Sequence, residues 1–177
     1  GESYGTTRAG AMVAELQEGW GSIDLNGVFL ISSIVDFQTG DFTDGNDIPY
    51  MTFLPTFAAT AWYHDALPNK DKWSSLEAFL YDVREFALNQ YTTFLFKGAL
   101  ATDAESQFVL EQLHQYTGLS RAYLKNSNLR INEFYFMKEL LRDRGQVVGR
   151  LDSRYLGTER NNVEARFDDD PSGYAID

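Results

Sequence analysis

The segment Val28–Val35 places the strongest constraint on the fold of this chain. It reads VFLISSIV, which is apolar or small at almost every position and contains several β-branched residues. A run that is apolar on both faces is typical of a strand buried inside a parallel sheet. Such a strand needs neighbours on both sides, and the sequence contains no second strand of comparable quality. We therefore expect a piece of a longer protein, as the first residue, Gly instead of Met, also indicates.

Helical spacing dominates the sequence on both sides of this strand. Before it, residues 6–20 have a single apolar stripe, formed by Ala9, Val13, Leu16 and Trp20. After it, helices are predicted over 73–97, 105–117 and 131–142, and a short strand over 147–151.

This order of elements predicts an α/β fold. A turn, a helix and a buried strand come first, and a mostly helical region follows. That order is expected when a helical cap is inserted after one strand of a sheet enzyme. We assign residues 1–37 to the sheet core, and residues 38–177 to the helical cap and a polar tail.

Composition excludes several classes of function. The chain has 15 Lys and Arg against 26 Asp and Glu, a net charge of -11, which opposes binding to nucleic acid. It has no Cys, so disulfides and thiolate sites are excluded. No apolar run reaches the roughly 18 residues that a membrane span needs. The acidic segment Gln38–Asn46 lacks the terminal Glu of a calcium loop, and no His and carboxylate spacing indicates a metal. We predict no cofactor.

The first five residues, Gly1-Glu2-Ser3-Tyr4-Gly5, match the G-x-S-x-G pattern of a nucleophile elbow. In that motif a Ser lies on a tight turn between a strand and a helix. A Cβ at either flanking glycine is expected to collide with the turn. The helix dipole and the Tyr4 N–H then lie where an oxyanion develops. The pattern predicts Ser3 as a nucleophile and Tyr4 as an oxyanion donor; the alternative is a plain glycine turn.

Glu2 is an unusual neighbour for an oxyanion site. A carboxylate there opposes the developing negative charge, unless it is paired, protonated or used to bind the substrate. The position therefore predicts an acidic pH optimum or a role in anchoring the substrate. The alternative is a Glu2 side chain that forms a salt bridge, for example with Arg8.

The candidates for a catalytic base and acid are weaker. His64 and His114 are both expected to lie in helices and to be ordinary residues of the helical cap region. Asp36 ends the predicted buried strand, a position from which an acid can occasionally serve. Several aromatic residues are candidates for lining a cleft, although helical spacing favours the core: Trp62, Tyr63, Phe79, Tyr81, Phe94 and Phe134.

The chain resembles the bacterial branch of the serine carboxypeptidase family. The resemblance rests on GESYG, where Glu precedes and Tyr follows the Ser, and extends over essentially all of the 177 residues. It is carried further by TTRAGAMVAELQ, LNGVFLISSIVDFQTGD, FLPTFAATAWYHDALP, NLRINEFYFMKELLRDRGQVVGRLDSRYLG and DDDPS.

The resemblance implies an α/β-hydrolase fold with a helical insertion, and release of C-terminal residues from peptides through an acyl-enzyme. It implies that Ser3 is the nucleophile, that the Tyr4 N–H is an oxyanion donor, and that Glu2 binds the substrate's C-terminal carboxylate by sharing a proton with a second glutamate. That glutamate, a glycine-rich oxyanion loop and the triad Asp and His are expected outside this chain. The isolated segment is then inactive, and its parent is an exported protein.

Two departures from the family bear on fine specificity rather than on class. Thr6 replaces the Gly or Ala of many relatives, and the cysteines of the eukaryotic members are absent. Two other functions stay open. One is an α/β-hydrolase that acts as an esterase or acyltransferase, and the other is a non-catalytic helical interaction module.

Overall fold

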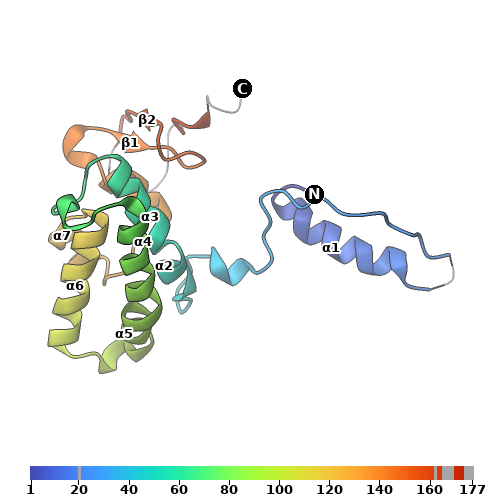
Figure 1. Cartoon of the computed structure of the whole chain (residues 1–177), viewed down its shortest axis with the longest axis horizontal. Coiled ribbons are helices and arrows are strands. Elements are labelled where there is room, and N and C mark those ends of the chain that lie inside the picture. The colour runs from blue at the N-terminus through green and yellow to red at the C-terminus, as the bar shows by residue number, and fades with distance from the viewer. Residues whose placement is uncertain (20, 162, 165–169, 174–177) are drawn as a thin grey trace. The chain divides into compact units, whose positions relative to one another are not determined.

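The structure is a computed structural model that describes residues 1–177 except 20, 162, 165–169 and 174–177 (Figure 1). Trp20, which the sequence places on the first helical stripe, lies outside the described residues. The chain divides into two compact units, Gly1–Asp41 and Phe42–Asp177, which we call unit 1 and unit 2.

Unit 1 consists of one helix between two short extended segments. The helix α1 spans Tyr4–Gln17, and a 3-10 turn, η1, spans Phe37–Thr39. The segment after the helix returns parallel to the segment before it, so that Glu2 and Ile31 form a parallel bridge. Unit 1 therefore contains the predicted turn, the predicted helix and an extended return.

The predicted α/β-hydrolase fold is wrong. The chain is mostly helical, and the only sheet in the described ranges is a two-stranded antiparallel pair in unit 2. In unit 1 the predicted buried strand has a single bridge, and Phe29 and Val35 are 87% and 91% exposed. A parallel sheet needs several apolar strands side by side. Residues 28–35 are the only such run here, and the segments after them have helical periodicity instead.

Unit 2 is built from short helices that begin and end at recognisable signals. Ser75 caps α4 by accepting from the Ala78 N–H, and Thr102 and Glu105 form a capping box at the start of α6. Gly118 ends α6 with a φ of 70°. The helices are α2 (Ile48–Thr52), α3 (Leu54–Tyr63), α4 (Leu76–Glu85), α5 (Thr92–Lys97), α6 (Asp103–Thr117), α7 (Arg121–Asn126) and α8 (Glu133–Glu139).

Three of the sequence-based helices are confirmed. The one predicted over 73–97 consists of α4, a π-helical segment η3 (Phe86–Tyr91) and α5 in direct succession. Those over 105–117 and 131–142 correspond to α6 and α8. Shorter 3-10 turns connect the helices: η2 (Lys70–Lys72), η4 (Gly98–Leu100) and η5 (Arg142–Arg144).

The core of unit 2 lies between α3, α4 and α6, which run side by side (Figure 1). Phe79 is fully buried at its centre, where it stacks on Trp62 and meets Trp73 edge to face. The aromatic residues proposed for a cleft therefore separate into two groups. Phe79, Trp62 and Phe94 belong to or pack against the core, whereas Tyr63, Tyr81 and Phe134 are exposed.

A small hairpin closes one end of unit 2. Strand β1 (Val147–Val148) pairs antiparallel with β2 (Leu156–Gly157), which confirms the predicted strand at its first two residues. The strand β1 packs against α8, and both of its residues are fully buried. Beyond β2, the Glu159 carboxylate forms an ion pair with Lys138 of α8. The Oε2 and Nζ atoms are 2.5 Å apart, and both side chains are 1% exposed.

No helix in the part of the chain that the structure describes has both the length and the apolar character needed to cross a membrane.

Candidate functional site

Ser3 lies on a strained turn between the extended start of unit 1 and α1. Its φ is 51° and its ψ is -127°, in the left-handed half of the map that favours glycine. Such a conformation costs about 1–3 kcal/mol and persists only where the surroundings enforce it. A turn therefore precedes α1 at Ser3, but the residue before it forms an isolated bridge and not the strand that the motif predicts.

Backbone hydrogen bonds enforce this turn from both sides. The Ser3 N–H donates to the Ile31 carbonyl at 3.0 Å, and the Ile31 N–H donates to the Gly1 carbonyl at 2.9 Å. On the helix side, the Gly5 N–H donates to the Glu2 carbonyl at 2.8 Å. An N-terminal Ser normally caps its helix, but the Ser3 side chain makes no capping hydrogen bond. Its hydroxyl group is thus not used to begin α1.

Thr6 is a residue of this site that sequence reasoning missed. It is 4% exposed, and its hydroxyl group donates to the Ser3 carbonyl at 2.7 Å while accepting from the Ile34 N–H at 3.1 Å. Thr7 adds a bond from its hydroxyl group to the Ile34 carbonyl at 2.9 Å. Thr6 therefore ties the turn to the returning segment, a role that neither Gly nor Ala can perform. The departure from the carboxypeptidase pattern was its only sequence signal.

The two flanking glycines are not equivalent. A Cβ at Gly1 would lie 2.1 Å from the Gly5 carbonyl oxygen, so the expected collision occurs there. A Cβ at Gly5 meets nothing within 4 Å, so the collision predicted at this position is wrong. Gly5 is the second residue of α1.

This asymmetry predicts different effects of two alanine substitutions. Gly1→Ala is expected to break the turn, because the obstructing atom belongs to the backbone and cannot move aside. Gly5→Ala is expected to leave the turn intact and to stabilise α1 by up to about 1 kcal/mol. Amide hydrogen exchange at Ser3 and Ile31 measures both effects. Unchanged exchange at these two amides in Gly1→Ala would contradict the assigned geometry.

Tyr4 is the first residue of α1, and its backbone N–H directly follows Ser3. An N–H at this position has no acceptor within the helix. The helix N-terminus also carries partial positive charge, which favours an anion next to Ser3. The Tyr4 side chain is 66% exposed. The structure thus places a donor directly after the serine, as an oxyanion site requires.

Glu2 is exposed and lies opposite Ile31 in the parallel bridge. Among the ion pairs of the described residues, none joins Glu2 to Arg8. The salt bridge between Glu2 and Arg8, which was the alternative to a role in substrate binding, is therefore not formed among the described residues.

The other catalytic candidates have structural roles. In unit 2, His64 is 8% exposed, and its Nε2 lies 2.6 Å from the Ser153 carbonyl oxygen. His114 Nδ1 lies 2.7 Å from the Leu119 carbonyl oxygen, close to the end of α6. In unit 1, the Asp36 carboxylate accepts from the Gln38 N–H at 2.9 Å and caps η1. No cluster of three metal-ligating side chains occurs among the residues described.

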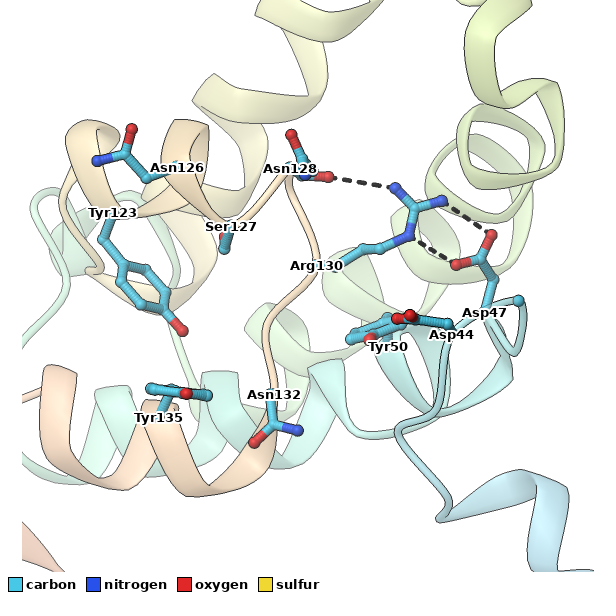
Figure 2. A pocket seen from close by; sticks show the side chains of 11 residues that line it. Asp44, Asp47, Tyr50, Tyr123, Asn126, Ser127, Asn128, Arg130, Asn132 and Tyr135 are labelled. Carbon is cyan, nitrogen blue, oxygen red and sulfur yellow. Dashed lines mark hydrogen bonds and ion pairs between the residues drawn. The ribbon is translucent and has the colours of Figure 1, made fainter. Parts of the chain in front are cut away.

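A second candidate site lies in unit 2, and sequence reasoning did not predict it. It is a cavity of about 700 Å³ between the start of α2, the end of α7 and the beginning of α8 (Figure 2). Gly45 and Ser127 form part of its wall, and its charged residues are Asp44, Asp47 and Arg130. The larger part of the wall consists of phenol and carboxamide side chains: Tyr50, Tyr123, Tyr135, Asn126, Asn128 and Asn132.

An ion pair between residues distant in sequence holds this cavity together. Arg130 Nε donates to Asp47 Oδ1 at 2.7 Å, and Arg130 Nη2 donates to Asp47 Oδ2 at 2.9 Å (Figure 2). The carboxylate raises the pKa of Arg130 above its usual value. Arg130 also donates to the Asn128 carbonyl at 3.3 Å. The pair joins the loop before α2 to the loop before α8.

Comparison with known protein families, curated proteins and solved structures finds no match to this chain. Its function is therefore inferred from the sequence motifs and from the geometry of the two sites.

Proposed function

We propose that this chain carries the nucleophile of a serine hydrolase, and that Ser3 is that nucleophile. The observation that supports the proposal most strongly is the strained backbone of Ser3, whose hydroxyl group does not cap α1. Strain of this kind concentrates at functional sites. A serine selected only to begin a helix would adopt an extended backbone and cap it.

The proposed chemistry is acyl transfer. Ser3 Oγ forms a bond to the substrate carbonyl carbon, its proton passes to a general base, and the carbonyl electron pair moves onto oxygen. The Tyr4 N–H stabilises the resulting oxyanion, assisted by the dipole of α1. Return of the electron pair then expels the protonated leaving amine and leaves an acyl group on Ser3. Since His64 and His114 both bond to backbone carbonyls in unit 2, we assign neither as the base.

The proposed substrate is a peptide with a free C-terminal carboxylate, and the proposed activity is that of a serine carboxypeptidase. Glu2 precedes the nucleophile and is exposed. A shared proton would let its carboxyl group hydrogen-bond the carboxylate of the substrate, which explains how an acidic residue is tolerated beside an oxyanion site.

The test of the nucleophile is labelling with a fluorophosphonate, using the protein isolated from its native cells. Peptide mapping by mass spectrometry locates the label. The expected result is a single label on the peptide that contains Ser3. The absence of label at Ser3, or a label on another serine alone, would overturn the proposal.

Substitution of Glu2 separates a carboxypeptidase from an esterase. Glu2→Gln keeps the size of the side chain but cannot share a proton. We expect KM to rise about 3- to 10-fold for a peptide with a free C-terminal carboxylate, the effect of one lost hydrogen bond. The methyl ester of the same peptide serves as the control and should show no such rise. Equal effects on both substrates would favour an esterase or acyltransferase.

A further inference from the structure

The cavity of unit 2 has an unusual lining. Ligand pockets in proteins are mostly apolar, with a few polar groups that orient the ligand. None of the side chains found to line this cavity is aliphatic, and its aromatic surface is provided by the rings of Tyr50, Tyr123 and Tyr135 (Figure 2). A ligand that fits must therefore offer many hydrogen-bonding groups together with a face that packs on an aromatic ring.

The phenol groups of these tyrosines are available to a ligand. Within the described part of the chain, none of the three hydroxyl groups has a hydrogen-bond partner, although Tyr50 and Tyr123 are half-buried. A phenol group is protonated at neutral pH and acts as both donor and acceptor. Burial raises the pKa of both Tyr50 and Tyr123 further. The carboxamide of Asn126, at the exposed end of α7, adds a donor and an acceptor.

The charges around the cavity disfavour an anionic ligand. Two of the guanidinium nitrogens of Arg130 donate to Asp47, and the third donates to the Asn128 carbonyl. A phosphate or carboxylate would have to displace this arrangement. Asp44 adds a further carboxylate to the wall, so the lining is net negative. The ligand that suits this wall carries no negative charge.

The backbone at the cavity wall is strained. Asn128 and Leu129 are consecutive non-glycine residues with positive φ values of 51° and 61°. Tyr91 holds the segment by donating its hydroxyl group to the Leu129 carbonyl at 2.5 Å, and Arg130 anchors its other end on Asp47. Two such residues in succession are costly, and strain of this kind is typical of ligand-binding segments.

We propose that this cavity binds a small uncharged saccharide, of about the size of a disaccharide. Sugar hydroxyl groups both donate and accept, as do the phenol and carboxamide groups of the wall. The C–H faces of a pyranose ring are apolar and suit the faces of the tyrosine rings. A cavity of about 700 Å³ lies within the range of small-molecule sites. This inference does not depend on the role of Ser3.

A peptide suits the wall less well. Two common modes of peptide binding use an exposed strand edge, which pairs with the peptide backbone, or apolar pockets that accept its side chains. The cavity has neither, since it is formed by helix ends and loops and no aliphatic residue lines it. Peptide binding is nevertheless the competing outcome of the test.

The test is a titration of the full chain with cellobiose, maltose and N,N′-diacetylchitobiose at millimolar concentrations, followed by heteronuclear NMR. We expect at least one sugar to shift the amide signals of Asn126–Asn132 saturably. Tyr123→Phe removes only the hydroxyl group and should weaken binding about 3- to 10-fold, the effect of one neutral hydrogen bond. Asn126→Ala, at an exposed position, should weaken it similarly.

The matched control is Tyr81→Phe, because Tyr81 is a 64% exposed tyrosine of α4 outside the cavity. Its affinity for the sugar should equal that of the unmodified chain. The proposal is overturned if none of the three sugars shifts these signals, or if neither Tyr123→Phe nor Asn126→Ala differs from the control. It is also overturned if tetra-alanine shifts the same amides and the sugars do not.

Discussion

Replacing Ser3 with Ala is expected to reduce kcat for peptide hydrolysis by about four to six orders of magnitude, with KM nearly unchanged. The substitution removes the oxygen that we propose forms the acyl-enzyme but leaves the Tyr4 N–H and the backbone bonds of the turn in place. The activity that persists should be that of oxyanion stabilisation and binding alone. Steady-state kinetics on an N-blocked dipeptide, with the protein isolated from its native cells, measures the loss.

Ser32 offers a matched control for this experiment. It is an exposed serine of unit 1 with a φ of 50°, almost equal to the 51° of Ser3, but it does not precede a helix. Ser32→Ala therefore imposes the same change on a similar backbone and should leave kcat within about twofold of the unmodified value, since no transition-state contact is lost. Equal losses in the two variants would show that the turn, and not the Ser3 hydroxyl group, is what matters.

Ser3→Gly separates the effect of residue 3 on activity from its effect on the stability of the fold. Ser3→Gly also removes the nucleophile, but it relieves the strain of a positive φ, which costs about 1–3 kcal/mol in a residue with a Cβ. We expect this variant to be as inactive as Ser3→Ala and no less stable than the unmodified chain in urea unfolding. An active Ser3→Gly variant would contradict the assignment of the nucleophile.

The helices of unit 2 were predictable because their signals are local. The segment that forms α6 has apolar residues at helical spacing and a glycine stop, and the structure adds a capping box at Thr102. Local signals of this kind depend on neighbours within a few residues. Helices can therefore be predicted from them without knowledge of the tertiary fold.

The strand predicted over 28–35 shows what a local sequence pattern cannot predict. Its apolar residues predicted a strand buried inside a parallel sheet, but in the structure the segment forms a single parallel bridge, between Ile31 and Glu2. Burial of a strand, however, depends on other strands beside it. The described residues form no such strands next to it, so the side chain of Phe29 is exposed although the pattern indicates a core position.

The cavity of unit 2 was beyond prediction because it has no period and no motif. Its wall combines residues 44–50 with residues 123–135, and the contact that joins them, Arg130 with Asp47, spans 83 positions. The wall combines residues of helix ends with residues of the loops between them, and these residues form no pattern in the sequence. Only the three-dimensional structure shows that their polar groups line one cavity.

The role of Lys138 was also not predictable from the sequence. Substitution of Lys138 is expected to have the largest effect on stability. A lysine in a helix is normally read as a surface residue, yet Lys138 is 1% exposed. Its ammonium group pairs with Glu159 at 2.5 Å and donates to the Asn161 carbonyl at 3.0 Å. It thereby fixes the segment after β2 against α8.

Lys138→Met is expected to lower the free energy of unfolding by about 3–5 kcal/mol, because it removes the ammonium group that pairs with the buried Glu159 carboxylate. Urea unfolding followed by circular dichroism measures the change. Lys97→Met is the matched control, since Lys97 pairs with Glu105 at the surface, where both side chains are well exposed. An exposed pair contributes little, so the control should unfold close to the unmodified chain.

The double variant Lys138→Met, Glu159→Leu tests whether the destabilisation by Lys138→Met comes from an unpaired buried charge. Apolar residues of similar volume often replace a buried ion pair at little cost, because the desolvation of both charges is avoided. We therefore expect the double variant to recover most of the stability that Lys138→Met loses. Failure to recover would mean that contacts other than the ion pair, among them the bond from Lys138 to the Asn161 carbonyl, hold the segment after β2. A Lys138→Met variant as stable as Lys97→Met would instead contradict the burial of the pair.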